Sequence, residues 1–181
     1  MKQRELVLLE VLSAFFQRKQ TRFTQLELSR TLNLSLSAVN AAVKRLSAMG
    51  AVEISPRGFR IVDAEKILFH ACNERDLQSD VIYQTRVDAP VSQMEKSMPP
   101  GVVYAAYSAC KFFLGHAPAD YGEVLVYATP DALQEIKKRF PAKKGPPNLT
   151  VLDGEGLQRV AQGGVAPLAL VYADLWNLKE W

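Results

Sequence analysis

The side chains best suited to chemistry in this sequence are small, polar and basic residues between positions 35 and 45. On a helical projection of about 100° per residue, Ser37, Asn40, Ala41 and Lys44 fall on one side. Such a face fits the major groove of B-DNA, which is about 12 Å wide and presents a distinct pattern for each base pair. Asn40 is the best candidate for base reading, because an asparagine amide pairs bidentately with adenine.

Basic side chains around this face predict contacts with DNA phosphates. Arg22 precedes the face, Lys44 and Arg45 lie along it, and Arg57 follows in a turn. Phosphate contacts orient a protein on the duplex without reading its sequence. The complete set of predicted DNA-binding residues is Arg22, Thr24, Ser35, Ser37, Asn40, Ala41, Lys44, Arg45, Arg57 and Arg60.

Residues that bind metals are scarce and widely spaced. The chain has two cysteines, Cys72 and Cys110, and two histidines, His70 and His116. Their separations match no zinc-binding spacing, and His70 with Cys72 would supply only half of a site. We therefore expect free thiols and ordinary histidines, with no metal and no cofactor.

The predicted DNA-binding face needs helices to position it. Apolar residues recur at helical spacing over residues 4–18, which predicts a first helix. Thr24, with Glu27 three residues later, is typical of a capping box and predicts a second helix over residues 25–32.

A turn at residues 33–34 leads to a third helix. Ser35 is expected to cap this helix, which runs to about Met49 with Gly50 at its end. The side opposite the polar face predicts a core made of Leu36, Val39, Val43 and Leu46.

The segment after Gly50 predicts a β-hairpin. Two short alternating stretches flank Pro56-Arg57-Gly58, a turn-forming sequence with a basic residue at its tip. Arg57 and Arg60 are placed to meet phosphate or the minor groove. Helix, helix, turn, helix and basic hairpin is the order of a winged helix-turn-helix.

Residues 23–62 resemble the winged helix of MarR-type regulators. The resemblance rests on Leu-Ser-Arg-Thr-Leu at 28–32, Ser-x-Ser-x-Val at 35–39 and Lys-Arg-Leu-x-x-x-Gly-x-Val at 44–52. It implies a protein that regulates transcription by binding DNA.

The net charge of +3 is unevenly distributed. Residues 1–62 carry ten Lys and Arg against four Asp and Glu, whereas residues 63–181 carry twelve against fifteen. The formal charges are therefore +6 and −3. This split predicts an anionic partner for the first segment and a different partner for the second.

The rest of the chain predicts a small sheet domain. A connecting helix is expected within residues 63–80, followed by a domain over residues 81–181. Its predicted elements are strands at 81–87, 124–128 and 149–152, a helix at 131–139 and a final helix that Pro167 opens. The predicted fold class is α+β, with a winged helix before this α/β domain. The chain ends inside an apparent helix at 179–181, so we expect the domain to be truncated.

The second half resembles the C-terminal region of the AbiEi group of antitoxins and their archaeal relatives. The matching segments are 98–109, 124–127 and 166–178. The resemblance implies a degenerate nucleotidyltransferase-like fold, an operon with a toxin, and autorepression of that operon.

A working nucleotidyltransferase needs a Gly-Ser turn and two carboxylates on the following strand, because Mg²⁺ requires oxygen ligands in close array. Ser108-Ala109 stands where the turn would be, and the apolar strand 124–128 stands where the carboxylates would be. We therefore expect no enzymatic activity.

Other clusters are interpreted structurally. Lys143 and Lys144 are expected to lie in a solvated proline-rich loop, and residues 137–139 to end a helix where cations are favoured. Asp174 and Trp176 are assigned to packing of the final helix. The predicted core of this domain includes Tyr104, Tyr107, Phe112 and Phe113.

Three functions compete. The leading prediction is a homodimeric regulator that places two helices in successive major grooves, with a toxin, a ligand or another protomer on its second domain. The alternatives are a nucleotidyltransferase-related enzyme and a winged helix that binds protein. No apolar run approaches the roughly 20 residues that cross a bilayer, and no signal peptide is evident. We expect a cytoplasmic protein.

Overall fold

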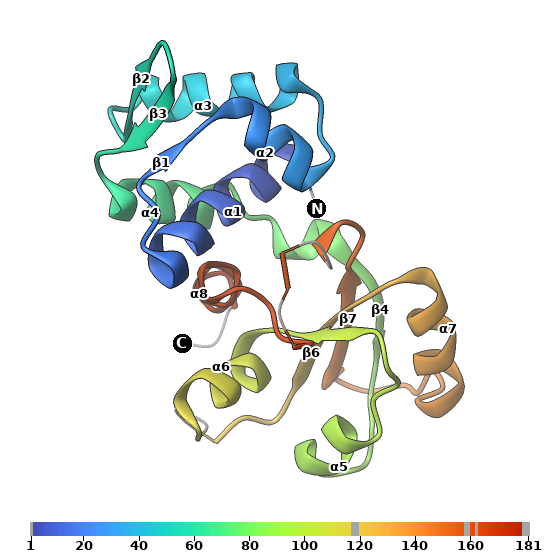
Figure 1. Cartoon of the computed structure of the whole chain (residues 1–181). Helices are drawn as coiled ribbons and strands as arrows, with labels where there is room; N and C mark the ends of the chain where they lie inside the picture. Colours follow the sequence, from blue (N-terminus) through green and yellow to red (C-terminus); the bar gives the residue numbers. More distant parts are fainter. Residues whose placement is uncertain (1, 117–119, 158–159, 162, 179–181) are drawn as a thin grey trace. The chain divides into compact units, whose positions relative to one another are not determined.

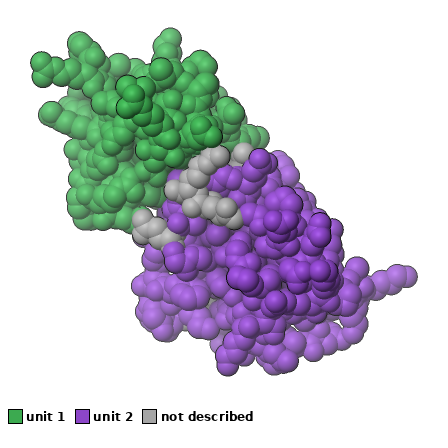
Figure 2. Space-filling view, turned by 45° about the vertical axis from the view of Figure 1, so that its right-hand side comes forward, with its two compact units in different colours: residues 1–75 green, residues 76–181 purple. Residues whose placement is uncertain are grey.

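The computed structural model describes residues 2–116, 120–157, 160–161 and 163–178. The chain divides into two compact units, residues 1–75 and 76–181 (Figure 2). The division falls after the helix that was expected to connect the domains, because that helix contacts the first helix of the chain. Residues 179–181, on which the predicted truncation rests, lie outside the described residues.

Unit 1 is a helix-turn-helix followed by a wing and a further helix (Figure 1). In chain order its described elements are α1 (Gln3–Arg18), β1 (Arg22–Phe23), α2 (Gln25–Leu32), α3 (Leu36–Ala48), β2 (Val52–Ser55), β3 (Gly58–Ile61) and α4 (Ala64–Glu74). The predicted helices and hairpin are therefore confirmed.

Local capping chemistry sets the bounds of α2 and α3. Thr24 Oγ1 accepts a hydrogen bond from the Glu27 amide at 3.1 Å, and Ser35 Oγ accepts one from the Ala38 amide at 3.2 Å. Such N-caps contribute about 1 kcal/mol each. Asn33 ends α2 in the left-handed region with φ 51°, a conformation that asparagine tolerates well. The chain therefore reverses sharply before α3.

The predicted core of unit 1 is confirmed except at one position. Val39, Val43 and Leu46 are buried, and α3 contacts both α1 and α2. Leu36, in contrast, is 50% exposed. It is the first residue of α3, where the helix has only just left its cap, so its side chain lies beyond the buried stripe. The assignment of Leu36 to the core was wrong.

The wing is a three-stranded antiparallel sheet in the order β1-β3-β2. The sequence predicted only β2 and β3, because the two residues of β1 are too few for a detectable alternation. Phe23 and Phe59 stack with ring centroids 5.4 Å apart and join β1 to β3. Gly58 makes this close approach possible, since a Cβ there would lie 2.1 Å from the Phe23 carbonyl oxygen.

Ion pairs attach α4 to the rest of unit 1. Glu74 meets Arg4 Nε and Arg45 Nη2, each at 3.0 Å, while Arg75 and Glu5 form a buried pair at 3.9 Å. These contacts join the end of α4 to the start of α1 and to α3. Residues 63–75 therefore belong to the winged-helix unit.

Unit 2 is a four-stranded mixed sheet with helices. Its described elements are the 3₁₀ helix η1 (Leu77–Asp80), β4 (Val81–Thr85), α5 (Val91–Lys96), β5 (Val102–Tyr104), α6 (Ala106–Leu114), β6 (Val124–Ala128), α7 (Pro130–Arg139), β7 (Leu149–Asp153) and α8 (Leu168–Trp176). The order is β4-β7-β6-β5, and only β6 and β7 run parallel among these neighbours. The α+β class and the strands β4, β6 and β7 were predicted, whereas the three-residue β5 was not.

The sheet of unit 2 is covered on both faces. Helices α5 and α7 contribute Met94, Ala132 and Ile136 to a core against β6 and β7. Helices α6 and α8 contact each other on the other face (Figure 1). There, fully buried Tyr127 donates a hydrogen bond to Asp174 at 2.7 Å, which agrees with a packing role for Asp174.

Two predictions for unit 2 were wrong. Phe112 and Phe113 are 60% and 41% exposed, because α6 packs through Ala106 and Ala109 and turns its last residues outward. The position expected for the transferase turn, Ser108-Ala109, lies inside α6, and the left-handed backbone is three residues before Ala109, at Ala106 with φ 46°. Ser108 is buried within the first turns of α6.

In the part of the chain that the structure describes, no helix has the length and apolar character needed to span a membrane.

Candidate nucleic-acid interface

Helix α3 presents an open polar face. Ser37, Ala41 and Lys44 are exposed and Asn40 is half-buried, as the helical projection predicted. The Ser35 and Ser37 hydroxyl oxygens lie 3.0 Å apart, so these two side chains already share a hydrogen bond at the start of the helix. The side chains on the first two turns of this face are small. They leave the helix backbone accessible to a partner that has a groove.

The turn before α3 is fixed by a residue that the sequence analysis missed. Ser29 Oγ donates to the Leu34 carbonyl oxygen at 2.6 Å, and the Leu34 amide donates to the Ser29 carbonyl oxygen at 3.0 Å. A serine inside a helix often bonds to nearby backbone, but its partner five residues later follows only from the turn geometry. These bonds hold α3 at a defined angle to α2.

The wing carries two of the predicted arginines. Arg57 lies in the exposed turn between β2 and β3. Arg60 on β3 stands opposite Glu53 in the strand register and binds it at 2.8 Å. Arg60 therefore has part of its charge compensated within the wing, whereas Arg57 has no ion pair with any described residue.

Four predicted residues gather around a hollow of about 410 Å³ that is lined by all three wing strands, the turn of the hairpin and the start of α2. Arg22, Thr24, Arg57 and Arg60 line it, together with Glu27 and Glu53. Arg22 stands directly opposite Arg60 in the pairing of β1 with β3. Three guanidinium groups stand against two carboxylates in this lining, which leaves a net positive charge that suits a backbone phosphate.

Other residues at this site were not predicted from the sequence. Gln25 and Ser55 join Thr24 and Arg57 around an adjoining hollow of about 280 Å³. Ser55 also donates to the Gly58 carbonyl oxygen at 3.2 Å, which stabilises the turn. The Ser-Pro pair at the end of β2 was the available signal for this position.

Arg45 is placed differently from the other predicted residues. Its guanidinium pairs with Glu74 of α4, so it holds α3 within unit 1. The remaining predicted residues form two groups, with Ser35, Ser37, Asn40, Ala41 and Lys44 on α3, and Arg22, Thr24, Arg57 and Arg60 around the hollow.

Among the described residues, no group of three or more His, Cys, Asp and Glu side chains lies close enough together to hold a metal ion. Cys72 is buried and Cys110 half-buried, both as free thiols, and burial raises the pKa of Cys110. Strand β6 is apolar and buried along its whole length.

Comparison with known proteins finds a family match within unit 1. Residues 19–53 match the sequence model of a winged helix-turn-helix DNA-binding family. The match spans β1, α2 and α3 and reaches the second residue of β2. The chain therefore contains a winged helix-turn-helix DNA-binding domain. No curated protein and no solved structure matches the chain, and the match favours neither MarR-type regulators nor AbiEi antitoxins in particular.

Proposed function

We propose that this protein is a transcriptional regulator that binds double-stranded DNA sequence-specifically through unit 1. The open polar face of α3, next to a wing hollow lined by three arginines, carries the proposal. In this arrangement α3 enters the major groove, with Asn40 toward a base edge and Lys44 toward a phosphate. A DNA target implies a cytoplasmic protein.

The regulator acts as a homodimer and represses its own operon in this proposal. Winged helices commonly read two half-sites about one DNA turn apart, which matches the two-fold symmetry of a dimer. Unit 2 then binds a protein partner, and a toxin from the same operon is the specific candidate. The support for that role is the resemblance of residues 98–109, 124–127 and 166–178 to the AbiEi group.

Unit 2 has no enzymatic role in this proposal. An enzyme of the nucleotidyltransferase class would need paired carboxylates on the strand after the turn, and β6 carries no carboxylate. Incubation of the full chain with Mg²⁺, labelled nucleoside triphosphates and RNA or protein should transfer no label. Transfer that is lost when unit 2 is mutated would contradict this.

The decisive experiment is a gel-shift titration of the full chain on DNA from upstream of its own gene, with scrambled DNA of equal length as the control. A regulator binds the upstream DNA much more tightly than the scrambled DNA. Equal affinity for both DNAs would show that the protein does not bind DNA sequence-specifically. Failure to bind either DNA would favour the alternative, a winged helix that binds protein.

A further inference from the structure

The cations of unit 2 are concentrated at one end of its sheet. Residues 76–181 contain ten Lys and Arg, and seven of them lie within the segments 86–97 and 137–147. Only two carboxylates, Asp88 and Glu95, fall in these segments, whereas the rest of the unit has ten. We call the seven clustered Lys and Arg residues the basic edge. They are Arg86, Lys96, Lys137, Lys138, Arg139, Lys143 and Lys144.

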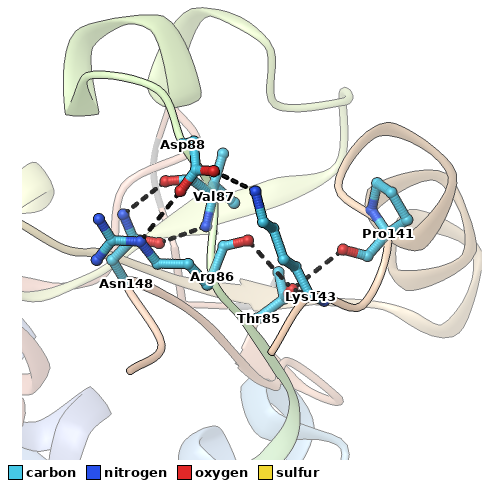
Figure 3. Close-up of polar contacts among 7 residues, drawn as sticks. All are labelled: Thr85, Arg86, Val87, Asp88, Pro141, Lys143 and Asn148. Carbon is cyan, nitrogen blue, oxygen red and sulfur yellow. Dashed lines mark hydrogen bonds and ion pairs between the residues drawn. The ribbon is translucent and has the colours of Figure 1, made fainter. Parts of the chain in front are cut away.

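The fold joins these two segments through the pairing of β4 with β7. The Asn148 side chain, just before β7, accepts from the Val87 amide at 2.7 Å and donates to the Val87 carbonyl oxygen at 2.9 Å (Figure 3). Thr85 Oγ1 donates to the Pro141 carbonyl oxygen at 3.0 Å and accepts from the Lys143 amide at 2.9 Å. The loop 141–148 is therefore attached to the end of β4.

Individual cations are also held in place. Gly145 lies close to Arg86, because a Cβ on this glycine would be 3.5 Å from the arginine Cγ. Arg139 donates to the Ser97 carbonyl oxygen at 3.0 Å, which ties the end of α7 to the end of α5. Lys137 Nζ lies 5.5 Å from the centroid of the Tyr83 ring. A preorganised set of cations loses less conformational entropy when an anion binds.

Carboxylates compensate only part of this charge: Glu135 pairs with Lys138 at 2.6 Å, and Asp88 and Glu95 are the two within the segments themselves. Asp88 contacts both Arg86 and Lys143 (Figure 3), and these cations lower its pKa. Glu95 is engaged elsewhere, by Tyr121 at 2.6 Å and by Lys111 at 3.1 Å. Lys96 and Lys144 form no ion pair within the described part of the chain.

We propose that the basic edge binds the phosphate backbone of double-stranded DNA without reading its sequence. This proposal rests on the proposed function of unit 1, because both name DNA as the ligand. It adds a second DNA contact surface, on unit 2. Clustered cations attract a polyanion over several ångströms, and DNA bound by unit 1 is already at high effective concentration for unit 2. The acidic remainder of unit 2 restricts this contact to the edge.

The first test neutralises the two unpaired lysines in the full chain. We expect Lys96→Gln with Lys144→Gln to weaken binding to a random-sequence duplex about tenfold at low salt. The slope of log K against log salt should also become shallower, by about 0.9 for each lost phosphate contact. Lys96→Arg with Lys144→Arg keeps both charges at the same positions, so it is the matched control and should leave the slope unchanged. An unchanged slope in the glutamine variant, or an equal loss in the arginine variant, would overturn the proposal.

The second test adds charge. Asp88→Asn removes the carboxylate shared by Arg86 and Lys143, so random DNA should bind several-fold more tightly and with a steeper salt dependence. Asp131→Asn, at the other end of α7, makes the same charge change away from the basic edge and should have little effect. Unchanged affinity in Asp88→Asn with an unchanged melting temperature would contradict a DNA-binding edge.

The wing variant Arg57→Gln separates the two proposals. If it weakens DNA binding while the double glutamine variant does not, unit 1 binds DNA and the basic edge does not. If the wild type binds no DNA, both proposals fail. If the double glutamine variant loses binding only to phosphatidylserine vesicles, the basic edge binds membranes instead and the present assignment is overturned.

Discussion

Single side chains on α3 differ in their freedom to meet DNA. Ser37 shares a hydrogen bond with Ser35, and Arg45 pairs with Glu74. Asn40 and Lys44 form no hydrogen bond or ion pair through their side chains with any described residue. A side chain with no existing partner gives up nothing within the protein when it bonds to a base or a phosphate, so these two residues have the most to gain from DNA.

Replacement of Asn40 by alanine tests base reading. We expect Asn40→Ala to weaken binding to the specific operator by about 1–3 kcal/mol and to leave binding to random DNA nearly unchanged, as the loss of a bidentate base contact should. Fluorescence polarisation titrations on both DNAs measure the two effects. Asn73→Ala, an exposed asparagine on α4, is the control. Equal losses on both DNAs would assign Asn40 a positioning role only.

Arg57 tests the contribution of a phosphate contact. In a dimer, Arg57→Gln removes one cation from each wing, so the slope of log K against log salt should become shallower by nearly two units, at about 0.9 per contact. Sequence preference should change little, because phosphate contacts position without specifying. Titrations over a salt series on matched and scrambled DNA measure both quantities. A slope equal to that of the wild type would remove the wing from the interface.

At the scale of elements, the wing depends on one close approach between backbones. β1 adds only two residues to the hairpin, yet it brings Arg22 beside Arg60 and closes the hollow from below. The approach of β1 to β3 requires a residue without a Cβ at position 58. The geometry of this hollow therefore follows from Gly58.

A methyl group at position 58 should open the wing. Gly58→Ala places a Cβ 2.1 Å from the Phe23 carbonyl oxygen at φ 137°, so β1 and β3 must separate. We expect a loss of more than about 1 kcal/mol in stability and weaker DNA binding. Urea unfolding followed by circular dichroism measures the stability. Gly50→Ala, with φ 72° but no atom within 4 Å of the added Cβ, carries backbone strain alone and should retain DNA binding.

At the scale of the whole molecule, each unit has its own core and its own charge character. Unit 1 buries α3 against α1 and α2, and unit 2 buries both faces of its sheet. The match to a DNA-binding family stops within unit 1. Stability of the second unit and DNA recognition by the first should therefore respond to different substitutions.

Tyr127 provides this test. Tyr127→Phe removes a buried hydrogen bond to Asp174, which should destabilise unit 2 by about 1.5–3 kcal/mol because the acceptor is a carboxylate. Both tryptophans, Trp176 and Trp181, belong to unit 2, so tryptophan fluorescence during urea unfolding reports on that unit. Operator binding at low denaturant should stay unchanged. A parallel loss of operator binding would show that recognition depends on an intact unit 2.

The sequence alone determined what short-range chemistry controls. Caps at Thr24 and Ser35, helical periodicity and the turn around Gly58 act over a few residues, so the helix-turn-helix and wing could be predicted with nearly correct bounds. The polar side of α3 followed from the same periodicity. In unit 2, β6 and β7 were visible as apolar runs and β4 as a partly alternating one, whereas the three residues of β5 are too few for a detectable pattern.

Only the tertiary structure decided which distant residues meet. The two-residue β1, the pairing of Arg45 with Glu74, and the outward position of Leu36 and Phe112 depend on how elements pack. The lysines of the loop 141–148 were interpreted as solvated and those of α7 as charges favoured at a helix end, and they form one edge with Arg86 because β4 pairs with β7. Such contacts link residues more than fifty positions apart, and no local pattern in the sequence encodes them.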